Sequence, residues 1–314
     1  EDTAVLPPYK RIIFDEAHGI ESAATSFFSE DLTKFKILKQ IRVLYRNRKN
    51  GAVAGHIFTL TALSIADDNS DEIIAAIERI KDTLQQLDEA SLALLDMQTT
   101  FRICVQTAHM FESIKAKFEN LGNALSDFIG LVRELIDTIS EDNRENQAVW
   151  ETKTILRRLD FMAVLCRNFT VWDEHQDNVF FIEKVRINAP VSASGPRFYC
   201  RFVQSPLDIS YKMNEGIFEP MDSVTCVSAT LRIGNNFNFW LNRSGASLVE
   251  PERLKTALFT SPFPYNKNML FAVPSDVPLP ENSSFQSFVE DAVVNLILSS
   301  CGRTLVLFTS YESL

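Results

Sequence analysis

The sequence predicts an α/β protein that carries a large all-α insertion. Short apolar runs that favour β-structure occur at residues 12–14 and 223–227, and each ends directly in polar side chains. Between them, residues 20–172 show apolar side chains at helical spacing. Strand patterns then return at 179–182 and 197–203. One long insertion within one α/β domain explains this order better than four tandem domains, because loops at strand ends tolerate insertions.

The composition is that of a globular protein that is rich in helix. The 314 residues include 24 Phe and only 10 Gly, and no apolar run is long enough to predict a membrane span. The five cysteines are scattered without a C-x-x-C pair, which predicts free thiols in a reducing, bacterial-type cytoplasm. The net charge of −10 argues mildly against a nucleic-acid partner, although binding depends on where the positive charges lie.

The first candidate site follows the strand at residues 12–14. Asp15 and Glu16 stand at its carboxyl end, followed by Ala17 and His18. A carboxylate at this place can hold Mg²⁺ beside the phosphates of a nucleotide, and a second one can orient and deprotonate water. His18 is then placed to sense the nucleotide. The alternative is that these acidic residues simply begin a helix, where they complement its dipole.

A second candidate lies at the carboxyl end of the strand at residues 223–227. Ser228, Ala229 and Thr230 follow it directly. Hydroxyl groups here can bond the acidic pair and report its state to another domain. Alone, such a tripeptide is most often a turn or a helix cap.

The insertion contains a basic helix and a long apolar seam. Residues 35–49 predict a helix with one apolar face and one basic face, and the basic face includes Lys39, Arg42 and Arg46. Such a face can follow the phosphates of single-stranded DNA, but charged faces are usually only solvated. After Asp71 and Glu72, apolar residues at steps of four and three predict a long hairpin or coiled coil.

A further α/β unit begins near the end of the sequence. Residues 284–299 predict a helix, and residues 304–308 predict a strand that ends at Thr309 and Ser310.

These motifs together resemble the DinG/XPD family of superfamily-two DNA helicases, and the DinG branch most. The resemblance covers the two ends of the chain, whereas the helical middle matches only in type. It rests on five segments in the family's order, which are RIIFDEAH at 11–18, SPLDIS at 205–210, MDSVTCVSATL at 221–231, SPFPY at 261–265 and GRTLVLFTSY at 302–311.

The resemblance implies a role for each candidate residue. Asp15 would hold Mg²⁺ and Glu16 would activate water, as the motif II pair of an ATP site. Ser228, Ala229 and Thr230 would form motif III, which couples nucleotide state to DNA. Thr309 and Ser310 would belong to motif IV, near the DNA backbone.

The resemblance also implies a domain layout. Residues 1–20 and 191–258 would belong to the first RecA-like motor domain, and residues 259–314 would begin the second. Residues 21–190 would be an Arch domain inserted after motif II. The basic residues Lys39, Arg42 and Arg46 of that block would contact single-stranded DNA.

The sequence departs from the family in lacking the phosphate loop G-x-x-x-x-G-K-[ST]. We therefore expect a truncated fragment of an ATP-dependent, 5′-to-3′ DNA helicase of repair or replication, without ATPase activity of its own. The ligands of any iron–sulfur cluster would lie outside this chain. Two other interpretations stay open: a helical module that binds DNA or protein without motor activity, and part of a DinG-like nuclease–helicase.

Overall fold

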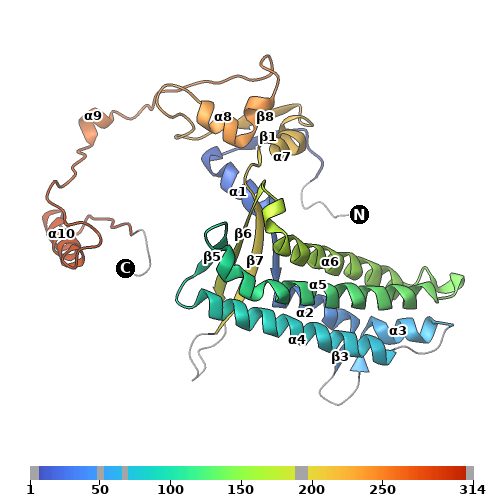
Figure 1. Ribbon diagram of the computed structural model, residues 1–314. Helices are drawn as coiled ribbons and strands as arrows, with labels where there is room; N and C mark the ends of the chain where they lie inside the picture. The colour runs from blue at the N-terminus through green and yellow to red at the C-terminus, as the bar shows by residue number, and fades with distance from the viewer. Residues whose placement is uncertain (1–6, 48–52, 66–69, 188–196, 309–314) are drawn as a thin grey trace. The chain divides into compact units, whose positions relative to one another are not determined.

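The computed structural model describes residues 7–47, 53–65, 70–187 and 197–308 (Figure 1). The chain divides into two compact units, residues 1–256 and 257–314. The first unit combines parallel strands, an antiparallel sheet and long helices, so the predicted α/β class is confirmed. In the described part of the chain, no helix has both the length and the hydropathy that a membrane crossing requires.

Three long helices lie side by side in the first unit (Figure 1). They are α4 (Ser70–Leu95), α5 (Ala108–Asp137) and α6 (Gln147–Thr170), and the shorter α2 (Lys34–Leu44) and α3 (His56–Leu63) pack against them. Local sequence sets their starts, because Thr33 caps α2 through Lys36 N, Asn146 caps α6 through Ala148 N, and Asp71 and Glu72 fill the first turn of α4.

The predicted apolar seam forms the core of this helical block. Ile73, Ile77, Ile80, Leu84 and Leu87 of α4 are at most 2% exposed, which confirms the predicted periodicity. At the other end of the block, Phe118 of α5 stacks on Phe169 of α6 at 4.7 Å and meets Phe202 edge-on at 5.1 Å.

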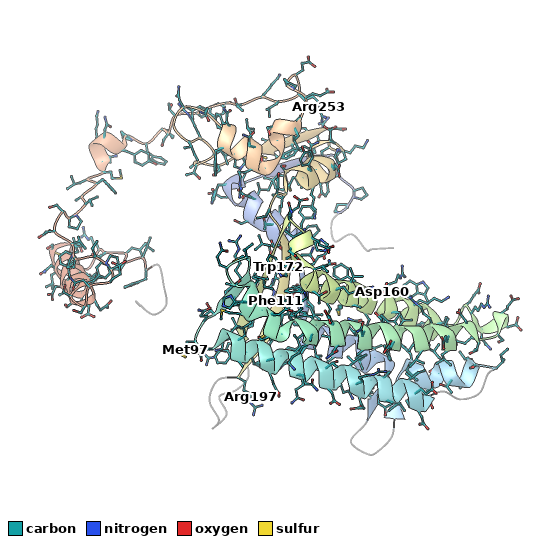
Figure 2. The ribbon with its side chains drawn as sticks, viewed as in Figure 1. Met97, Phe111, Asp160, Trp172, Arg197 and Arg253 are labelled. Carbon is teal, nitrogen blue, oxygen red and sulfur yellow. The ribbon has the colours of Figure 1, made fainter. Side chains whose placement is uncertain are left out.

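Aromatic contacts thus join two of the helices to the sheet. Phe111 and Trp172 lie at this junction, whereas Asp160 lies farther along α6, where it pairs with Arg133 of α5 (Figure 2). Trp172 belongs to a short 3-10 turn, η3 (Trp172–Glu174), and a similar turn, η2 (Glu141–Asn143), separates α5 from α6.

An antiparallel sheet of four strands covers one end of the block. Its order is β2 (Glu30–Thr33), β7 (Phe198–Pro206), β6 (Asn178–Arg186) and β5 (Thr100–Ile103). The strand pair at 179–182 and 197–203 is confirmed, but the expectation of continuous helix over 20–172 is wrong at β2 and β5. Both are four residues long and become strands through partners at least 77 positions away, Glu30 opposite Gln204 and Ile103 opposite Phe180.

The predicted helix over residues 35–49 is also too long. It ends at Leu44, and Arg46 instead lies in β3 (Arg46–Asn47), paired with β4 (Val53–Ala54). The returning strand brings Gly55, at a φ of 133°, against the Leu44 carbonyl, so closely that an added Cβ would lie 2.2 Å from that oxygen. This glycine and the buried Tyr45 turn the chain away from the helix.

A separate small core surrounds the two parallel strands β1 (Arg11–Phe14) and β8 (Ser223–Cys226). Its other elements are η1 (Ala17–Gly19), α1 (Ile20–Phe28), α7 (Ser210–Met213), the π-helical turn η4 (Asn214–Phe218), α8 (Asn238–Ser244) and η5 (Ala246–Leu248). Both strands exist as predicted, but the expectation that they are buried is wrong, since Ile13 is 73% exposed. Among the described residues each of them has only the other as a neighbour.

Over residues 257–308, the described part of the second unit, there are two helices, α9 (Tyr265–Asn268) and α10 (Phe285–Ser299). The helix predicted at 284–299 is confirmed to within one residue. The strand predicted at 304–308 is wrong, because those residues pair with no strand among the described residues and a strand needs a partner for its backbone hydrogen bonds. Thr309 and Ser310 lie outside the described residues.

Candidate functional site

The two predicted motifs meet at one edge of the parallel strand pair. Phe14 is in register with Cys226, so the residues after each strand leave the sheet together. Val227 N donates to Phe14 O at 2.9 Å, and Ala17 N donates to Val227 O at 2.9 Å. The carboxyl ends of parallel strands are where α/β sheets place ligands.

Glu16 has an unusual backbone at this edge. Its φ of 49° and ψ of 44° lie in the left-handed region, which costs a residue with a side chain about 1 kcal/mol or more. Its amide donates to the Asp15 carboxylate at 2.9 Å. A strained residue persists only where its surroundings hold it, and such residues concentrate at functional sites.

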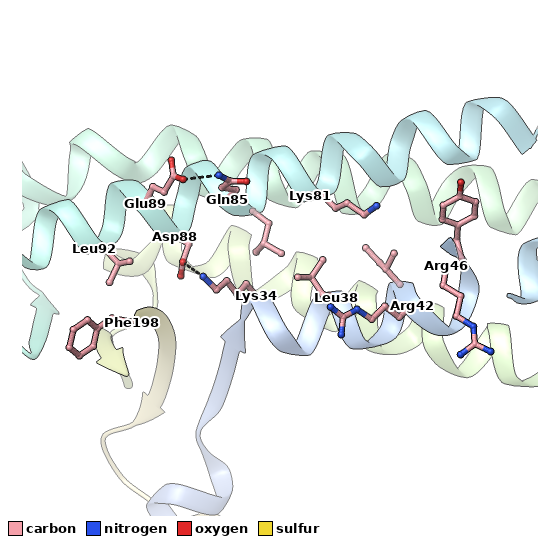
Figure 3. Close-up of a pocket in the computed structure, with 13 residues that line it drawn as sticks. Lys34, Leu38, Arg42, Arg46, Lys81, Gln85, Asp88, Glu89, Leu92 and Phe198 are labelled. Carbon is pink, nitrogen blue, oxygen red and sulfur yellow. Dashed lines mark hydrogen bonds and ion pairs between the residues drawn. The ribbon is translucent and has the colours of Figure 1, made fainter. Parts of the chain in front are cut away.

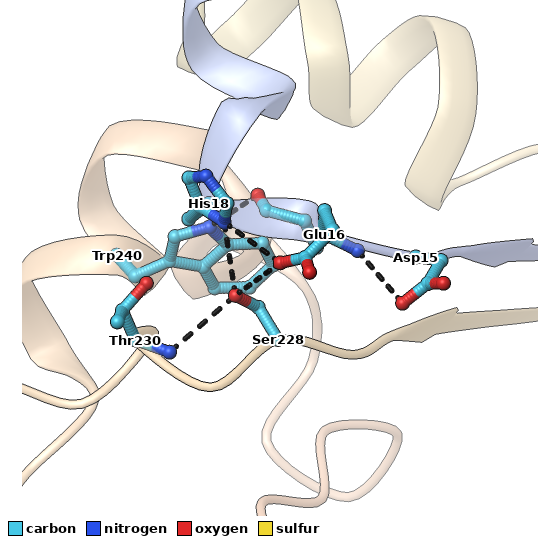
Figure 4. Close-up of polar contacts among 7 residues, drawn as sticks. Asp15, Glu16, His18, Ser228, Thr230 and Trp240 are labelled. Carbon is cyan, nitrogen blue, oxygen red and sulfur yellow. Dashed lines mark hydrogen bonds and ion pairs between the residues drawn. The ribbon is translucent and has the colours of Figure 1, made fainter. Parts of the chain in front are cut away.

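Ser228 links the two motifs through its hydroxyl (Figure 4). Its Oγ lies 3.0 Å from His18 Nδ1 and donates to Glu16 Oε2 at 3.4 Å. It also accepts from Thr230 N at 3.4 Å. The same His18 nitrogen lies 3.2 Å from Glu16 Oε2, which closes a triangle of three side chains.

This triangle relates the tautomer of His18 to the hydroxyl of Ser228. A hydroxyl has one hydrogen to donate, and Ser228 uses it toward the carboxylate of Glu16. The contact with His18 is then a hydrogen bond only if His18 Nδ1 carries a proton and donates it. In the tautomer with the proton on Nδ1, His18 donates toward both Ser228 and Glu16, and the opposite ring nitrogen stays available to another group.

The other predicted residues of the two motifs are open to solvent. Asp15, Ala229 and Thr230 are all exposed. Within the described ranges, no three His, Cys, Asp or Glu side chains gather so as to hold a metal ion by themselves. Asp15 nevertheless fits Mg²⁺, which is commonly held by one or two carboxylates together with water and phosphate oxygens.

No sequence pattern predicted the contribution of α8. Trp240 Nε1 donates to Ala17 O at 2.9 Å, and Arg243 pairs with Glu21 of α1. The Glu21 pair raises the pKa of Arg243, chiefly through its hydrogen bond. A tryptophan ten residues after the second motif is too common a feature to predict a site.

A thiol near the site is inert. Burial raises the pKa of Cys226, the last residue of β8, to about 11. This group therefore stays protonated at neutral pH and offers no nucleophile to the site.

A separate groove of about 910 Å³ runs between α2 and α4 (Figure 3). Aliphatic side chains such as Leu38 and Leu84 line it, with Arg42, Arg46 and Lys81 around them. The predicted basic face is therefore divided. Arg42 and Arg46 line the groove, whereas Lys39 is exposed but does not line it.

The two arginines differ from the other cations around the groove. Lys34 reaches Asp88 at 2.5 Å, and Lys81 pairs with Glu78 at 2.6 Å. Lys36, on the opposite side of α2, pairs with Asp31 at 2.6 Å. These three positive charges are therefore already balanced by carboxylates.

Comparison with known proteins gives two relatives that align with nearly the whole chain. The ATP-dependent DNA helicase YoaA of Haemophilus influenzae is 24% identical, over 98% of this chain and 41% of its own length. The 3′-5′ exonuclease DinG of Bacillus subtilis is 22% identical, over 98% of this chain and 34% of its own length. The chain is a relative of the DinG-like helicases.

This DinG-like relationship agrees with the order of motifs along the sequence. The chain spans less than half the length of either curated relative. No protein-family profile matches the chain.

Proposed function

We propose that this DinG-like chain supplies the metal-and-water half of the ATP site of a DNA helicase. The observation that carries the proposal is the triangle of Glu16, His18 and Ser228, in which motif II and motif III are in direct contact. The similarity to the ATP-dependent DNA helicase YoaA supports it, and the second relative, an exonuclease, also acts on nucleic acid. Residues that bind the β- and γ-phosphates would come from outside this sequence.

Asp15 would hold Mg²⁺ through one carboxylate oxygen. Its other oxygen, Oδ1, already accepts the Glu16 amide, which limits how far the carboxylate can turn. Bound there, the ion would neutralise charge on the phosphates. The exposed position of Asp15 leaves room for the waters and phosphate oxygens that complete an octahedral shell.

Glu16 would orient a water molecule and accept its proton. The Glu16 side chain is 72% exposed, so water reaches it freely. Ser228 and the Nδ1–H of His18 both donate toward Oε2, which leaves Oε1 for the water. These two donors would hold the carboxylate in one orientation, as a general base requires.

Ser228 would couple this base to the rest of the motor. It lies two residues after the end of β8, so a shift of that strand would move the hydrogen bonds to Glu16 and His18 together. Ala229 and Thr230 would pass the shift onward. Thr309 and Ser310 would contribute to DNA binding from the second motor domain.

The helical block would be the inserted Arch domain, and its return point lies later than residue 190. Strand β7 (Phe198–Pro206) pairs with both β2 and β6, so we place the return to the motor domain after Pro206. Movement in the 5′-to-3′ direction and a role in repair or replication rest on the family resemblance alone. A nuclease activity of the whole protein is the alternative that the DinG relative suggests.

The test is ATP turnover by a protein that carries this chain together with a phosphate loop. Glu16→Gln should lower kcat by about 10²- to 10⁴-fold, because it removes a general base. The KM for ATP should change little. Glu252→Gln is a matched control on an exposed position in the same unit and should leave kcat unchanged. Wild-type kcat in the Glu16 variant, or turnover by the 314-residue chain alone, would contradict the proposal.

A second function, binding of single-stranded DNA, is favoured by the two arginines of the groove. Arg42 and Arg46 are exposed, and Lys39 lies on the same helix as Arg42. Each phosphate contact made by a cation releases counterions, so the affinity for a single strand falls with salt at a slope of about 0.7 per contact. The helical block would then help to guide the strand.

Charge reversal tests this second function on the chain itself. Binding of a fluorescent oligo-dT should weaken in the variant with Arg42→Glu and Arg46→Glu, and its salt slope should fall by about 1.4 for two lost contacts. Lys153→Glu, an exposed position on α6, has the same kind of charge change and is the control. Equal affinity and equal slope in all variants would show that the arginines are merely solvated.

A further inference from the structure

The turn between Glu16 and His18 is held from both sides by the chain that follows β8. Ala17, at its centre, is 1% exposed. Its N–H donates to Val227 O at 2.9 Å, and its carbonyl accepts from Trp240 Nε1 at 2.9 Å. The Ala17 carbonyl also accepts from Ile20 N, a local bond that η1 makes with its own C-cap. The indole is therefore the contact that ties this carbonyl to a distant element.

The indole is held firmly enough to serve as an anchor. Trp240 lies in α8 and packs against the small core that includes Ile20 and Ala24 of α1. One turn later on α8, Arg243 pairs with Glu21 of α1. Two side chains of one short helix thus hold the segment that follows the catalytic pair.

The bond from the indole stabilises the strained backbone conformation of Glu16. A left-handed glutamate would relax toward an ordinary conformation if the next peptide were free to rotate. Rotation of that peptide would swing the Glu16 carboxylate away from Ser228 and change the approach of His18. A polar bond to the Ala17 carbonyl opposes such a rotation.

We propose that Trp240 is a positioning residue of the ATP site, which fixes the turn that presents Glu16 and His18. The inference rests on the proposed function, because the benefit of a fixed Glu16 is faster attack by water. Trp240 touches neither nucleotide nor metal in this role and acts only through the Ala17 peptide. Two residues of the downstream segment then hold motif II. Ser228 contacts its side chains, and Trp240 binds its backbone.

The sharpest test replaces Trp240 with benzothienylalanine, which keeps the shape of the ring and removes only the N–H. Hydrogen exchange of the backbone over residues 14–22 should become about two- to tenfold faster in the 314-residue chain, as expected for one lost hydrogen bond. The same substitution at Trp172, which packs against the helical core, is the control and should leave this segment unchanged. Unchanged exchange at residues 14–22 in the Trp240 variant would overturn the proposal.

Kinetics provide the second readout, in the longer protein that carries a phosphate loop. The same replacement should lower kcat about two- to tenfold and leave the KM for ATP unchanged, since only the chemical step needs a fixed Glu16. Faster exchange without a fall in kcat would also overturn the positioning role. Absence of ATPase in the wild-type protein would instead refute the proposed function, and hydrogen exchange would still decide whether the indole fixes the turn.

Discussion

The ion pair between Asp88 and Lys34 gives the most quantitative prediction for the fold. Asp88 lies in α4, and its side chain is 6% exposed. One carboxylate oxygen accepts from Lys34 Nζ at 2.5 Å, and the other accepts from the buried Cys200 N at 2.8 Å. A single carboxylate thus joins α4 to the start of α2 and to β7, at one end of the groove (Figure 3).

Removal of this carboxylate should destabilise the chain by about 3 kcal/mol. Asp88→Ala leaves the buried Cys200 N–H without its acceptor, which costs about 1–3 kcal/mol. It also leaves the ammonium group of Lys34 without its carboxylate partner, and loss of one partner from a buried pair costs about 3–5 kcal/mol. The Lys34 side chain is 26% exposed and can turn toward water, so we expect only part of the cost of losing its partner.

Urea denaturation followed by far-UV circular dichroism measures this cost. In a double-mutant cycle with Lys34→Met, the two substitutions should have a coupling energy of about 1.5–3 kcal/mol. Once one substitution has removed the ion pair, the other should lower the free energy of unfolding by little more. Asp127→Ala is the control, since Asp127 forms an exposed pair with Arg79 and should contribute less than about 1 kcal/mol. A cost for Asp88→Ala equal to that of the control would refute the reasoning.

Two further predictions concern the active-site link and the thiols. In a protein that joins this chain to a phosphate loop, the proposed function predicts that Ser228→Ala lowers kcat for ATP and weakens the stimulation of turnover by DNA. The midpoint of thermal unfolding should stay nearly constant because the hydroxyl is only half-buried. The Thr107 hydroxyl lowers the pKa of Cys104, whereas burial raises the pKa of Cys166 to about 12. Iodoacetamide should therefore modify Cys104 before Cys166, at a rate that levels off at a lower pH than for an ordinary thiol, and mass spectrometry of the digested chain would show the opposite order if this is wrong.

The sequence predicted the meeting of the two motifs because a simple rule governs it. Parallel strands end at the same edge of a sheet, so polar residues after two such strands come together whatever lies between them. It also predicted the seam of α4, since burial of one face repeats along the chain at the helical period. These features depend only on local patterns.

The missed features depend on contacts between distant residues. The four residues of β2 are Glu30, Asp31, Leu32 and Thr33, which carry little β-propensity and become a strand only through β7. Likewise, the end of α2 at Leu44 is imposed by Gly55, and the role of Trp240 depends on a bond across 223 positions. No local window of the sequence contains these partners.

The topology explains how so large an insertion leaves the site intact. β1 and β8 are direct neighbours, although more than 200 residues separate them, so the chain leaves and re-enters near one place. The first and last strands of the block, β2 and β7, pair with each other, and Ser29 Oγ donates to Ser205 Oγ at 2.8 Å beside that pair.

The block is therefore joined to the site through two paired strands and α1, which begins directly after the turn that carries His18. A force on the helical block would reach that turn through α1, and the bonds of Trp240 and Arg243 act at the end of α1 nearest the site. If DNA binding to the block changes ATP turnover, this short helix is a direct route from the block to the turn. Weakening of its anchor by Arg243→Gln should then reduce the stimulation by DNA more than the basal rate.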